Sequence, residues 1–377
     1  MLNSLLTKKI VVQAAAELGF ARTVVASLEP MEAERRFFEE WLAMGYAGTM
    51  AYLKRNPYSR TSPQLLHPQA YCALILFAPY YTLPPPHPGP RYGQVARYAV
   101  GLDYHDVIPH KLSLLKTLLE ERLGRPLLGK YFSDNVELFE PAFARSAGLG
   151  FTGKNSMIIG PQLMGSYHFI AELFTDLPLE PDEPYGGTCG KCFRCGSACP
   201  TGAIVGDGVV DARLCISYLT IENKGEIPLN LREKLGGWVF GCDICQEVCP
   251  YNQRPPVSIW NEFQPHQGVG HFLDLYDVLK ISDKKEFLLK FGHTPLSRAK
   301  RKGLLRNALV VIGNQKPEDA PQILHDFAVN EPEPILREHA AWALSCYDSG
   351  HAQELFDRLY SREPDLHCRS QMMLYRR

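Results

Sequence analysis

The sequence predicts an α+β protein built in three parts, and three observations lead to this prediction. Residues 1–180 mix helical patterns with short apolar runs typical of strands, residues 181–255 hold most of the cysteines, and residues 256–377 are mainly helical in pattern. A chain of 377 residues is long enough for two or three domains, and 45% hydrophobic residues is typical of a globular protein with buried cores. We expect one domain in each of the three ranges.

The first part, residues 1–180, alternates helical periodicity with apolar runs that polar or proline-rich segments bound. The expected helices are 3–18, 30–44 and 106–123. The expected strands are YCALILFAPYY (71–81) and SYHFIAELFT (166–175). Proline and glycine predict a loop at LPPPHPGP (83–90) and a linker at PLEPDEPYGG (178–187).

Two cysteine runs define the middle part. The first has the spacing C-x2-C-x2-C-x3-C-P, and the second has the spacing C-x2-C-x3-C-P. The cysteines of the two runs are, in order, Cys189, Cys192, Cys195, Cys199, Cys242, Cys245 and Cys249. In bacterial ferredoxins the three close cysteines of such a run bind one [4Fe–4S] cluster and the fourth binds the other cluster. We therefore expect a ferredoxin-like module with two [4Fe–4S] clusters.

Counting thiolates assigns the ligands of each cluster. The first cluster takes Cys189, Cys192, Cys195 and Cys249. The second run lacks its leading cysteine, because Val239 stands there. The second cluster therefore takes Cys199, Cys242, Cys245 and the one other cysteine of the module, Cys215. Paired CxxC motifs also bind zinc, which is the alternative, but zinc ribbons do not use the full run ending in Cys-Pro. The isolated Cys72, Cys346 and Cys368 are expected to be small buried hydrophobes.

The last part carries an approximate repeat of about 31 residues. LRNALVVIG starts at Leu305 and LREHAAWALS starts at Leu336, with Pro332 and Pro364 at similar breaks. Such a period is typical of stacked helix pairs of the HEAT type, although an ordinary helical bundle is the alternative.

Charge and segment composition indicate where the protein works. The formal net charge is −1, so attraction to nucleic acid must come from a local patch. The N-terminal stretch is amphipathic, lacks the apolar core of a signal peptide, and no run is apolar enough to span a bilayer. We expect a cytoplasmic protein with no membrane contact, in which clustered cysteines bind metal.

Most of the chain lies outside the cysteine module, which favours an enzyme over a small electron carrier. The sequence has no GxGxxG or Walker A pattern and therefore no sign of a Rossmann or P-loop cofactor. It also lacks a complete DxHxxG cobalamin signature: Asp103 and His105 begin one, but Ile108 stands in place of the glycine.

The chain resembles epoxyqueuosine reductases over essentially its whole length. The resemblance rests on ARYAVGLDYHD (96–106), YFSDNVELFEPAFARSAGLGFTGKNSMII (131–159), the two cysteine runs, and RKGLLRNALVVIGN with LREHAAWAL in the last part. It implies reduction of epoxyqueuosine to queuosine at the tRNA wobble position, with base-off cobalamin and two [4Fe–4S] clusters. Base-off binding needs no histidine ligand, which agrees with the incomplete DxHxxG motif.

The resemblance also implies an architecture and partners. Residues 1–180 would be an α/β cobalamin-binding catalytic domain, residues 181–255 the two-cluster module, and residues 256–377 a HEAT-like domain. The expected partners are a tRNA anticodon stem-loop and an electron donor such as a ferredoxin or flavodoxin, and the expected state is a monomer.

Asp134 in YFSDN is, by resemblance, the general acid that protonates the opened epoxide. The sequence alone favours another interpretation, because Asp134 and Glu137 form a capping-box pattern before a helix through about residue 147. Beside a corrin, desolvation would raise the pKa of this carboxyl.

Other residues of the resembling segments are candidates for cofactor binding. Each has an alternative: a surface turn for Lys154 and Asn155, a pocket-lining or core position for Tyr104 and His105, and a solvated surface for the arginines. The full set is Arg60, Arg97, Tyr104, His105, Lys154 and Asn155.

A basic stretch at the start of the last part is the candidate tRNA contact. Basic side chains bind phosphates, although charge runs are usually solvated faces. Its members are Arg298, Lys300, Arg301, Lys302 and Arg306. An unpaired anticodon base could then enter the catalytic pocket.

Two other functions fit parts of the pattern. A reductive dehalogenase acting on a small molecule uses related cofactors, but the missing export signal and the helical C-terminal part disfavour it. An electron-transfer subunit would not need the long first part.

Overall fold

The computed structural model describes residues 4–376 and divides into two compact units, each assembled from separate stretches of the chain. The first unit consists of residues 1–83, 102–213 and 243–267. The second unit consists of residues 84–101, 214–242 and 268–377. The three-part division at residues 180 and 255 stays a prediction.

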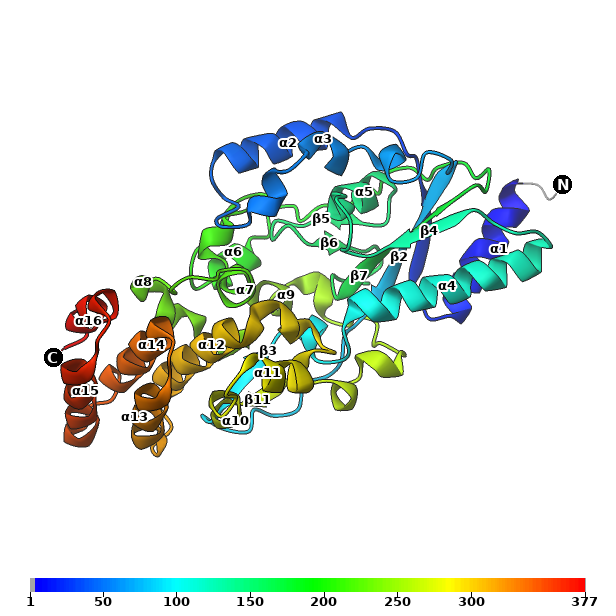
Figure 1. Cartoon of the computed structure of the whole chain (residues 1–377). Coiled ribbons are helices and arrows are strands. Elements are labelled where there is room, and N and C mark those ends of the chain that lie inside the picture. Colours follow the sequence, from blue (N-terminus) through cyan, green and yellow to red (C-terminus); the bar gives the residue numbers. More distant parts are fainter. Residues whose placement is uncertain (1–3, 377) are drawn as a thin grey trace. The chain divides into compact units, whose positions relative to one another are not determined.

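A four-stranded antiparallel sheet forms the centre of the first unit, in the order β1-β2-β7-β4 (Figure 1). These strands are β1 (Arg22–Ala26), β2 (Cys72–Pro79), β7 (His168–Thr175) and β4 (Gly129–Phe132). Every residue of β2 is buried, which explains its continuous apolar run. The strands expected near 71–81 and 166–175 are confirmed as β2 and β7.

Helices cover the two faces of this sheet. The helices α1 (Ser4–Glu17) and α4 (Tyr104–Leu123) pack against each other and against the sheet, and α5 (Glu140–Ser146) packs on the opposite face with a core that includes Phe143 and Phe174. The expected helices are confirmed as α1, α4 and α2 (Glu32–Ala43). The segments expected to be a loop at 83–90 and a linker at 178–187 have no helix or strand.

The remaining elements of the first unit are short. Beyond α2 lie α3 (Pro57–Arg60) and the small hairpin of β5 (Phe151–Thr152) and β6 (Ile158–Ile159). The cysteine-rich segments contribute α6 (Arg194–Ala198), β8 (Ile204–Gly206), β9 (Val209–Val210) and α9 (Ile244–Glu247).

The second unit combines a small sheet with a run of helices. The sheet has the order β10-β3-β11 and consists of β10 (Trp238–Phe240), β3 (Tyr92–Val95) and β11 (Phe272–Asp274). Its first helices are α7 (Ile216–Ile221), α8 (Leu229–Arg232), α10 (Leu275–Leu279) and α11 (Lys284–Phe291). The last five helices are α12 (Lys300–Gln315), α13 (Ala320–Asn330), α14 (Pro334–Ser345), α15 (Gly350–Arg362) and α16 (Leu366–Met373).

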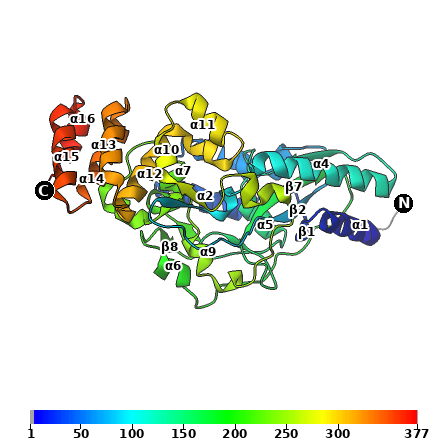
Figure 2. The same cartoon turned by 90° about the horizontal axis from the view of Figure 1, so that it is seen from below.

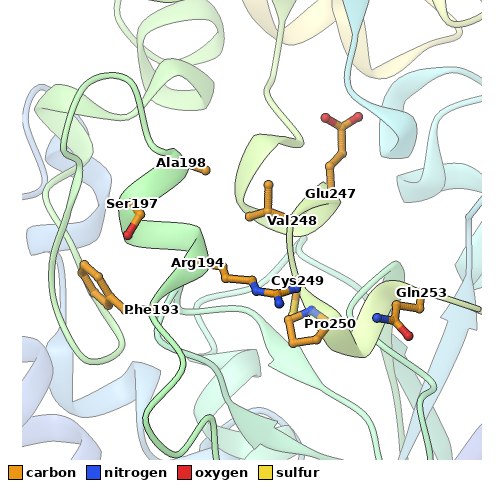
Figure 3. A pocket seen from close by; sticks show the side chains of 9 residues that line it. All are labelled: Phe193, Arg194, Ser197, Ala198, Glu247, Val248, Cys249, Pro250 and Gln253. Atoms are coloured by element: carbon orange, nitrogen blue, oxygen red, sulfur yellow. The ribbon is translucent and has the colours of Figure 1, made fainter.

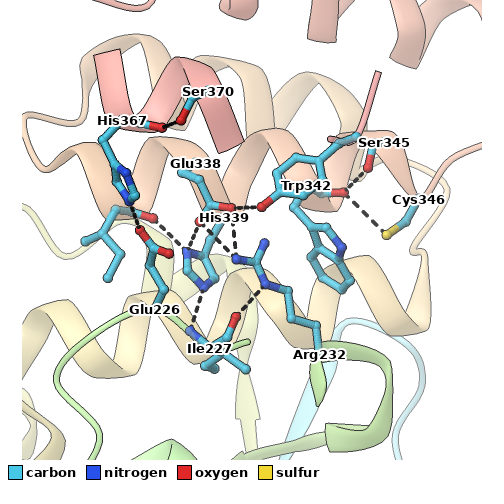
Figure 4. Close-up of polar contacts among 12 residues, drawn as sticks. Glu226, Ile227, Arg232, Glu338, His339, Trp342, Ser345, Cys346, His367 and Ser370 are labelled. Atoms are coloured by element: carbon cyan, nitrogen blue, oxygen red, sulfur yellow. Dashed lines mark hydrogen bonds and ion pairs between the residues drawn. The ribbon is translucent and has the colours of Figure 1, made fainter. Parts of the chain in front are cut away.

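The last helices pack around α14, which contacts α12, α13, α15 and α16, and α13 also contacts α15 (Figure 2). A buried ion pair joins α8 to α14, with Arg232 Nη2 2.8 Å from a Glu338 oxygen. Figure 4 shows how His339 completes this group: its Nε2 accepts the N–H of Ile227, so its Nδ1 carries the proton that faces Glu338. Tyr375 donates its hydroxyl to the same carboxylate.

The three isolated cysteines differ in exposure. Cys72 and Cys368 are buried, as expected, whereas Cys346 is partly exposed, so the prediction for Cys346 is wrong. Within residues 4–376, no helix is long and apolar enough to cross a membrane.

Candidate active site and cluster-binding module

Asp134 lies in the turn between β4 and α5, with a left-handed backbone (φ 54°). The helix α5 begins only at Glu140, and its N-cap position is Phe139. The capping-box interpretation of Asp134 is therefore wrong, because a residue six positions before a helix cannot cap its first N–H groups. The side chain of Asp134 is 69% exposed, so it is presented to solvent or to a ligand.

The first turn of α4 supplies the partners of Asp134. The Tyr104 hydroxyl donates to Asp134 Oδ2 at 2.6 Å, and His105 Nε2 lies 3.8 Å from the same oxygen. Tyr104 is held between two rings, since it stacks on His105 at 4.1 Å and on Phe169 at 4.3 Å. The structure thus brings Asp134 next to Tyr104 and His105, which precede it by about thirty positions in the sequence.

Asp103 orients His105. It caps α4 by accepting the backbone N–H of His105, and its Oδ1 lies 2.7 Å from His105 Nδ1. This hydrogen bond, the charge of Asp103 and the nearby charge of Asp134 raise the pKa of His105 against the opposing effect of burial. A positive charge on His105 is therefore favoured next to the Asp134 carboxylate.

Two further carboxyl groups lie beneath the Asp134 turn. Glu140 accepts the backbone N–H of Asp134, and Glu172 of β7 is completely buried. Burial, followed by the charge of Asp134, raises the pKa of Glu140 well above its usual value.

A separate cavity of about 560 Å³ lies between α2 and α5. Its lining is mixed and includes the aromatic side chains of Phe37, Trp41 and Phe139. Arg60 is buried at its wall and donates to the Tyr52 carbonyl at 3.0 Å, while the Arg60 Nε has no hydrogen-bond partner among the described residues. Arg60 is therefore a buried lining residue and not the solvated arginine of the alternative interpretation.

Four cysteines of the first unit surround one small hollow. Its lining includes Cys189, Cys192, Cys195 and Cys249. Burial, and then the like charges of the other three thiolates, raise the pKa of Cys249, which reflects how closely the four sulfurs approach. Within residues 4–376, no three His, Cys, Asp or Glu side chains converge as a single metal ion requires. Four thiols around a hollow fit the ligand set of a [4Fe–4S] cluster.

Lys154 and Asn155 line this same hollow. Lys154 Nζ lies 3.3 Å from Asp207, and the buried amide Nδ2 of Asn155 has no hydrogen-bond partner among the described residues. Both residues therefore lie beside the cysteines, although neither lines the Arg60 cavity.

An open groove borders the cysteine hollow between α6 and α9 (Figure 3). Arg194 extends from α6 toward Cys249 and Pro250, and Phe193 and Gln253 lie at the two ends of the view. Cys249 takes part in both the groove and the hollow.

The other predicted cofactor residues divide between the units. Cys199 and Cys245 lie in the first unit, and Cys215, Cys242 and Arg97 lie in the second. Cys199 accepts the backbone N–H of Ala203 at 3.3 Å. Its pKa is lowered although burial opposes this, because the Thr201 hydroxyl and nearby N–H groups stabilise a thiolate.

The basic stretch of the second unit does not form one uniform surface. Arg306 is 1% exposed and donates to the carbonyls of Leu219, Asn223 and Gly225. Its assignment to a tRNA surface is therefore wrong, because its guanidinium is buried and hydrogen-bonded inside the fold. Arg301 is mostly buried and pairs with Glu331 at 2.7 Å.

Three residues of the stretch remain exposed. Arg298 pairs with Glu222 at 2.7 Å and Lys302 approaches Glu333 at 3.5 Å, whereas Lys300 has no ion-pair partner among residues 4–376. Lys224, distant in sequence, joins them by donating to the Arg298 carbonyl at 3.0 Å. Arg298, Lys300, Lys302 and Lys224 form the exposed basic patch of the second unit.

Sequence reasoning missed Asp103, Glu140, Glu172 and Lys224. Asp103 was visible as the acid two positions before His105, and Glu172 as a lone charge inside an apolar strand. Nothing local marks Glu140 or Lys224, because their roles depend on residues far along the chain.

Two family models match the chain. Residues 60–135 match the model described as epoxyqueuosine reductase QueG, DUF1730. Residues 188–252 match the 4Fe-4S double cluster binding domain, and this range includes all eight cysteines predicted to be ligands.

Curated relatives are similar over most of their length. An epoxyqueuosine reductase from Vibrio cholerae is 36% identical over 341 residues, covering 88% of this chain and 89% of the relative. The epoxyqueuosine reductase of Escherichia coli is 34% identical, with 87% and 86% covered.

Solved structures agree with this similarity. A crystal structure of epoxyqueuosine reductase with an epoxyqueuosine-modified tRNA-Tyr stem loop has a TM-score of 0.89 and 31% identity, covering 99% of this chain and 98% of that one. A structure of the Bacillus subtilis enzyme, described with its Asp134 catalytic loop swung out of the active site, has a TM-score of 0.88 and 31% identity, with 99% of each chain covered.

Proposed function

Because the chain belongs to the epoxyqueuosine reductase family, it is an oxidoreductase that reduces epoxyqueuosine in tRNA to queuosine, and we propose that Asp134 is its general acid. The observation that carries this proposal is the exposed Asp134 carboxyl held by the Tyr104 hydroxyl at 2.6 Å. A positioned carboxylic acid can protonate the oxygen that leaves as the epoxide opens.

The overall reaction sets what the protein must supply. Removing the epoxide oxygen as water, with a carbon–carbon double bond left behind, consumes two electrons and two protons. The chain supplies the protons and the orientation of the substrate, whereas a redox cofactor supplies the electrons. One proton comes from Asp134 in this proposal.

Tyr104 and His105 position the acid. Tyr104 fixes one oxygen of Asp134 and is itself fixed by stacking between His105 and Phe169. The cation favoured on His105 stabilises the carboxylate that Asp134 becomes after it has given up its proton. Asp103 maintains the His105 ring orientation through the 2.7 Å contact.

Iron–sulfur clusters follow from the matching domain, whereas the cysteines that bind each cluster are proposed. The double-cluster domain binds iron–sulfur clusters. We assign one cluster to Cys189, Cys192, Cys195 and Cys249, which surround one hollow. On the spacing of the sequence, we assign the other to Cys199, Cys215, Cys242 and Cys245.

Base-off cobalamin is the proposed second cofactor, and the first unit contains features that fit it. The cavity of about 560 Å³ has aromatic side chains in its wall that can pack on a flat ring, and the buried Arg60 Nε is a hydrogen-bond donor without an acceptor among the described residues. Asn155, which lines the cysteine hollow and not the Arg60 cavity, offers a second buried donor for an amide or phosphate oxygen. When bound, a reduced corrinoid supplies a strong nucleophile and electron donor for epoxide opening. We propose Arg60, Arg97, Lys154 and Asn155 as contacts and Tyr104 with His105 as pocket walls.

The second unit is the proposed tRNA-binding part. Its exposed basic patch can contact phosphates, while Arg306 holds the segment that carries Lys224. The packing of α14 against α12, α13, α15 and α16 supports HEAT-like repeats over residues 256–377. A ferredoxin or flavodoxin as donor, a monomeric state and a cytoplasmic location stay predictions, as does the division into domains at residues 180 and 255.

A conversion assay tests the proposed function. The purified chain, reconstituted anaerobically with iron, sulfide and cobalamin, is incubated with an epoxyqueuosine-containing anticodon stem-loop and a strong one-electron reductant. The modified nucleoside should lose the mass of one oxygen, and omitting cobalamin should abolish the change. An unchanged nucleoside, with clusters and cobalamin both bound, would overturn the proposal.

A further inference from the structure

Two buried carboxyl groups of the first unit have no positive partner. Glu172 is 0% exposed, and neither of its oxygens has a hydrogen-bond partner in the described residues. Glu140 is 8% exposed and accepts only the Asp134 N–H. No ion pair within residues 4–376 involves either of them. Two adjacent charges without compensation would be strongly unfavourable in such a site, so at least one carboxyl must hold a proton.

The fold places these carboxyls on the same face of the sheet, near the Asp134 turn. Glu172 pairs in register with Ile75 of β2 and with Phe132 of β4, both of which belong to the core under α5. Glu140 is the first residue of α5, which packs on that same face. Phe132 is two residues before Asp134. The position of Glu172 therefore lies near both the Asp134 turn and the start of α5.

The charged side chains on the elements around this pair interact with other residues. Arg60 approaches Glu137 at 3.7 Å, and Arg145 of α5 pairs with Glu34. Lys130 of β4 donates to the Leu66 carbonyl at 3.4 Å.

His168, on the same strand as Glu172, is buried and stacked on Phe77 at 4.1 Å. Burial lowers its pKa to about 4, so it is neutral at physiological pH. None of these groups provides a counter-charge for the two glutamates.

The reaction needs more protons than Asp134 holds. Each turnover consumes two protons, and Asp134 can deliver only one before it must be reprotonated. Bound tRNA would cover the Asp134 side chain, which is 69% exposed in the free protein, and a proton held inside the protein would then have a use.

We propose that Glu140 and Glu172 share one proton and act as the buried proton store that recharges Asp134 during turnover. This inference rests on the proposed role of Asp134. In each cycle the store gives its proton toward the Asp134 carboxylate and recovers it from solvent after product leaves. No oxidant or further reactant is needed, because only a proton moves. Both glutamates are positioning residues, since they act through Asp134.

The electrostatics agree with this geometry. Burial, followed by the charges of Glu140 and Asp134, raises the pKa of Glu172 well above its usual value. A raised carboxyl pKa means that the proton is retained to a higher pH than in a free carboxyl and is lost as the pH rises through that pKa. Replacing Glu140 by glutamine removes its charge, so the pKa of Glu172 should fall.

Infrared spectroscopy tests the shared proton directly. Full-length chain with its clusters is labelled with ¹³C-carboxyl glutamate, and the band of protonated carboxyl is followed from pH 5 to 9. Wild type should retain a label-sensitive band at pH 7, and Glu172→Gln should lose it near neutral pH. The control is Glu262→Gln, because Glu262 pairs with Lys111 at 2.8 Å and should contribute no such band. A wild-type spectrum without protonated glutamate at pH 7 would overturn the proposal.

Single-turnover kinetics test the use of the proton. With pre-reduced holoenzyme, Glu172→Gln should slow conversion about tenfold at pH 8. The decrease of the rate at alkaline pH should also begin at a lower pH than in wild type. Glu172→Asp keeps a titrating group and should restore part of the wild-type profile.

A purely structural role for Glu172 predicts a lower melting temperature with an unshifted profile, and that result would overturn the proposal. If wild type itself does not convert the substrate, the proposed function fails, while the infrared result still decides whether the proton is shared.

Discussion

Replacement of Arg306 by alanine distinguishes a structural arginine from the proposed phosphate-binding residues near it. Arg306 donates to the carbonyls of Leu219, Asn223 and Gly225 and is 1% exposed. A buried polar group left without its partner costs about 1–3 kcal/mol. Three such carbonyls give a loss of stability of at least about 3 kcal/mol for Arg306→Ala. In a domain of 150–250 residues this corresponds to a fall in melting temperature of roughly 6–12 °C.

The matched control is Lys300→Ala in the same basic stretch. Lys300 is exposed and has no ion-pair partner within residues 4–376, so its removal should change stability by less than about 0.5 kcal/mol. It should weaken tRNA binding and reduce the slope of log affinity against log salt by about one unit if one phosphate contact is lost.

Thermal melting followed by circular dichroism, and tRNA binding measured at several salt concentrations, distinguish the two roles. If Arg306→Ala melted like wild type and reduced the salt slope as Lys300→Ala does, Arg306 would be a phosphate contact and the structural argument would be refuted.

Three further predictions concern the clusters, the basic patch and the buried ion pair. Cys215→Ala should lower bound iron or convert one cluster to a three-iron form, whereas Cys72→Ala should not; an unchanged iron content and EPR spectrum would exclude Cys215 as a ligand. The double variant Lys300→Ala/Lys302→Ala should lose more tRNA affinity at low salt than either single variant, and equal affinities would indicate a merely solvated face. Glu338→Gln should cost about 3–5 kcal/mol in urea unfolding at pH 7, because it leaves the Arg232 charge buried without its partner. Burial opposes the charged form of Glu338, but the contacts with His339, Arg232 and Tyr375 outweigh it and lower the pKa of Glu338 to about 2. Wild type therefore loses this stabilisation only as the pH falls from about 4.5 toward 2. An equally steep loss of stability at acid pH in the variant would contradict the assignment.

The gathering of four cysteines around one hollow could be predicted from the sequence because the spacing of three of them is local, while their role as ligands of one cluster stays a prediction. Cys189, Cys192 and Cys195 lie within one turn-rich segment, and the ferredoxin pattern adds Cys249 from the second run. The structure brings these four around a hollow. The apolar runs that became β2 and β7 were equally clear, because strands buried on both faces carry almost no polar residues.

The Asp134 turn could not be predicted from local pattern alone. An Asp followed three positions later by Glu is the usual start of a helix, and this pattern led to the capping interpretation. The positive φ of Asp134 and the later start of α5 depend on how the turn packs over Glu140 and Glu172. The residues next to Asp134 in the sequence do not indicate those contacts.

The basic stretch shows the same limit. Arg301, Lys302 and Arg306 look alike in the sequence, yet Arg306 is fully buried and Lys302 is exposed. Position along the helix decides this difference, because α12 is buried from Gly303 to Gly313 whereas Lys302 lies in its exposed first turn. The carbonyls that bind Arg306 come from residues about eighty positions earlier, which no charge count could reveal.

The rate of Asp134→Asn is the most direct test of the central claim that Asp134 donates the proton in epoxyqueuosine reduction. Asparagine tolerates a left-handed backbone nearly as well as aspartate and can accept the Tyr104 hydrogen bond, but it has no dissociable proton. At equal loading with clusters and cobalamin, the account predicts a wild-type melting temperature and a single-turnover rate reduced by about a hundredfold or more. Conversion of epoxyqueuosine to queuosine at the wild-type rate would contradict it, and the proton would then come from another group or from water.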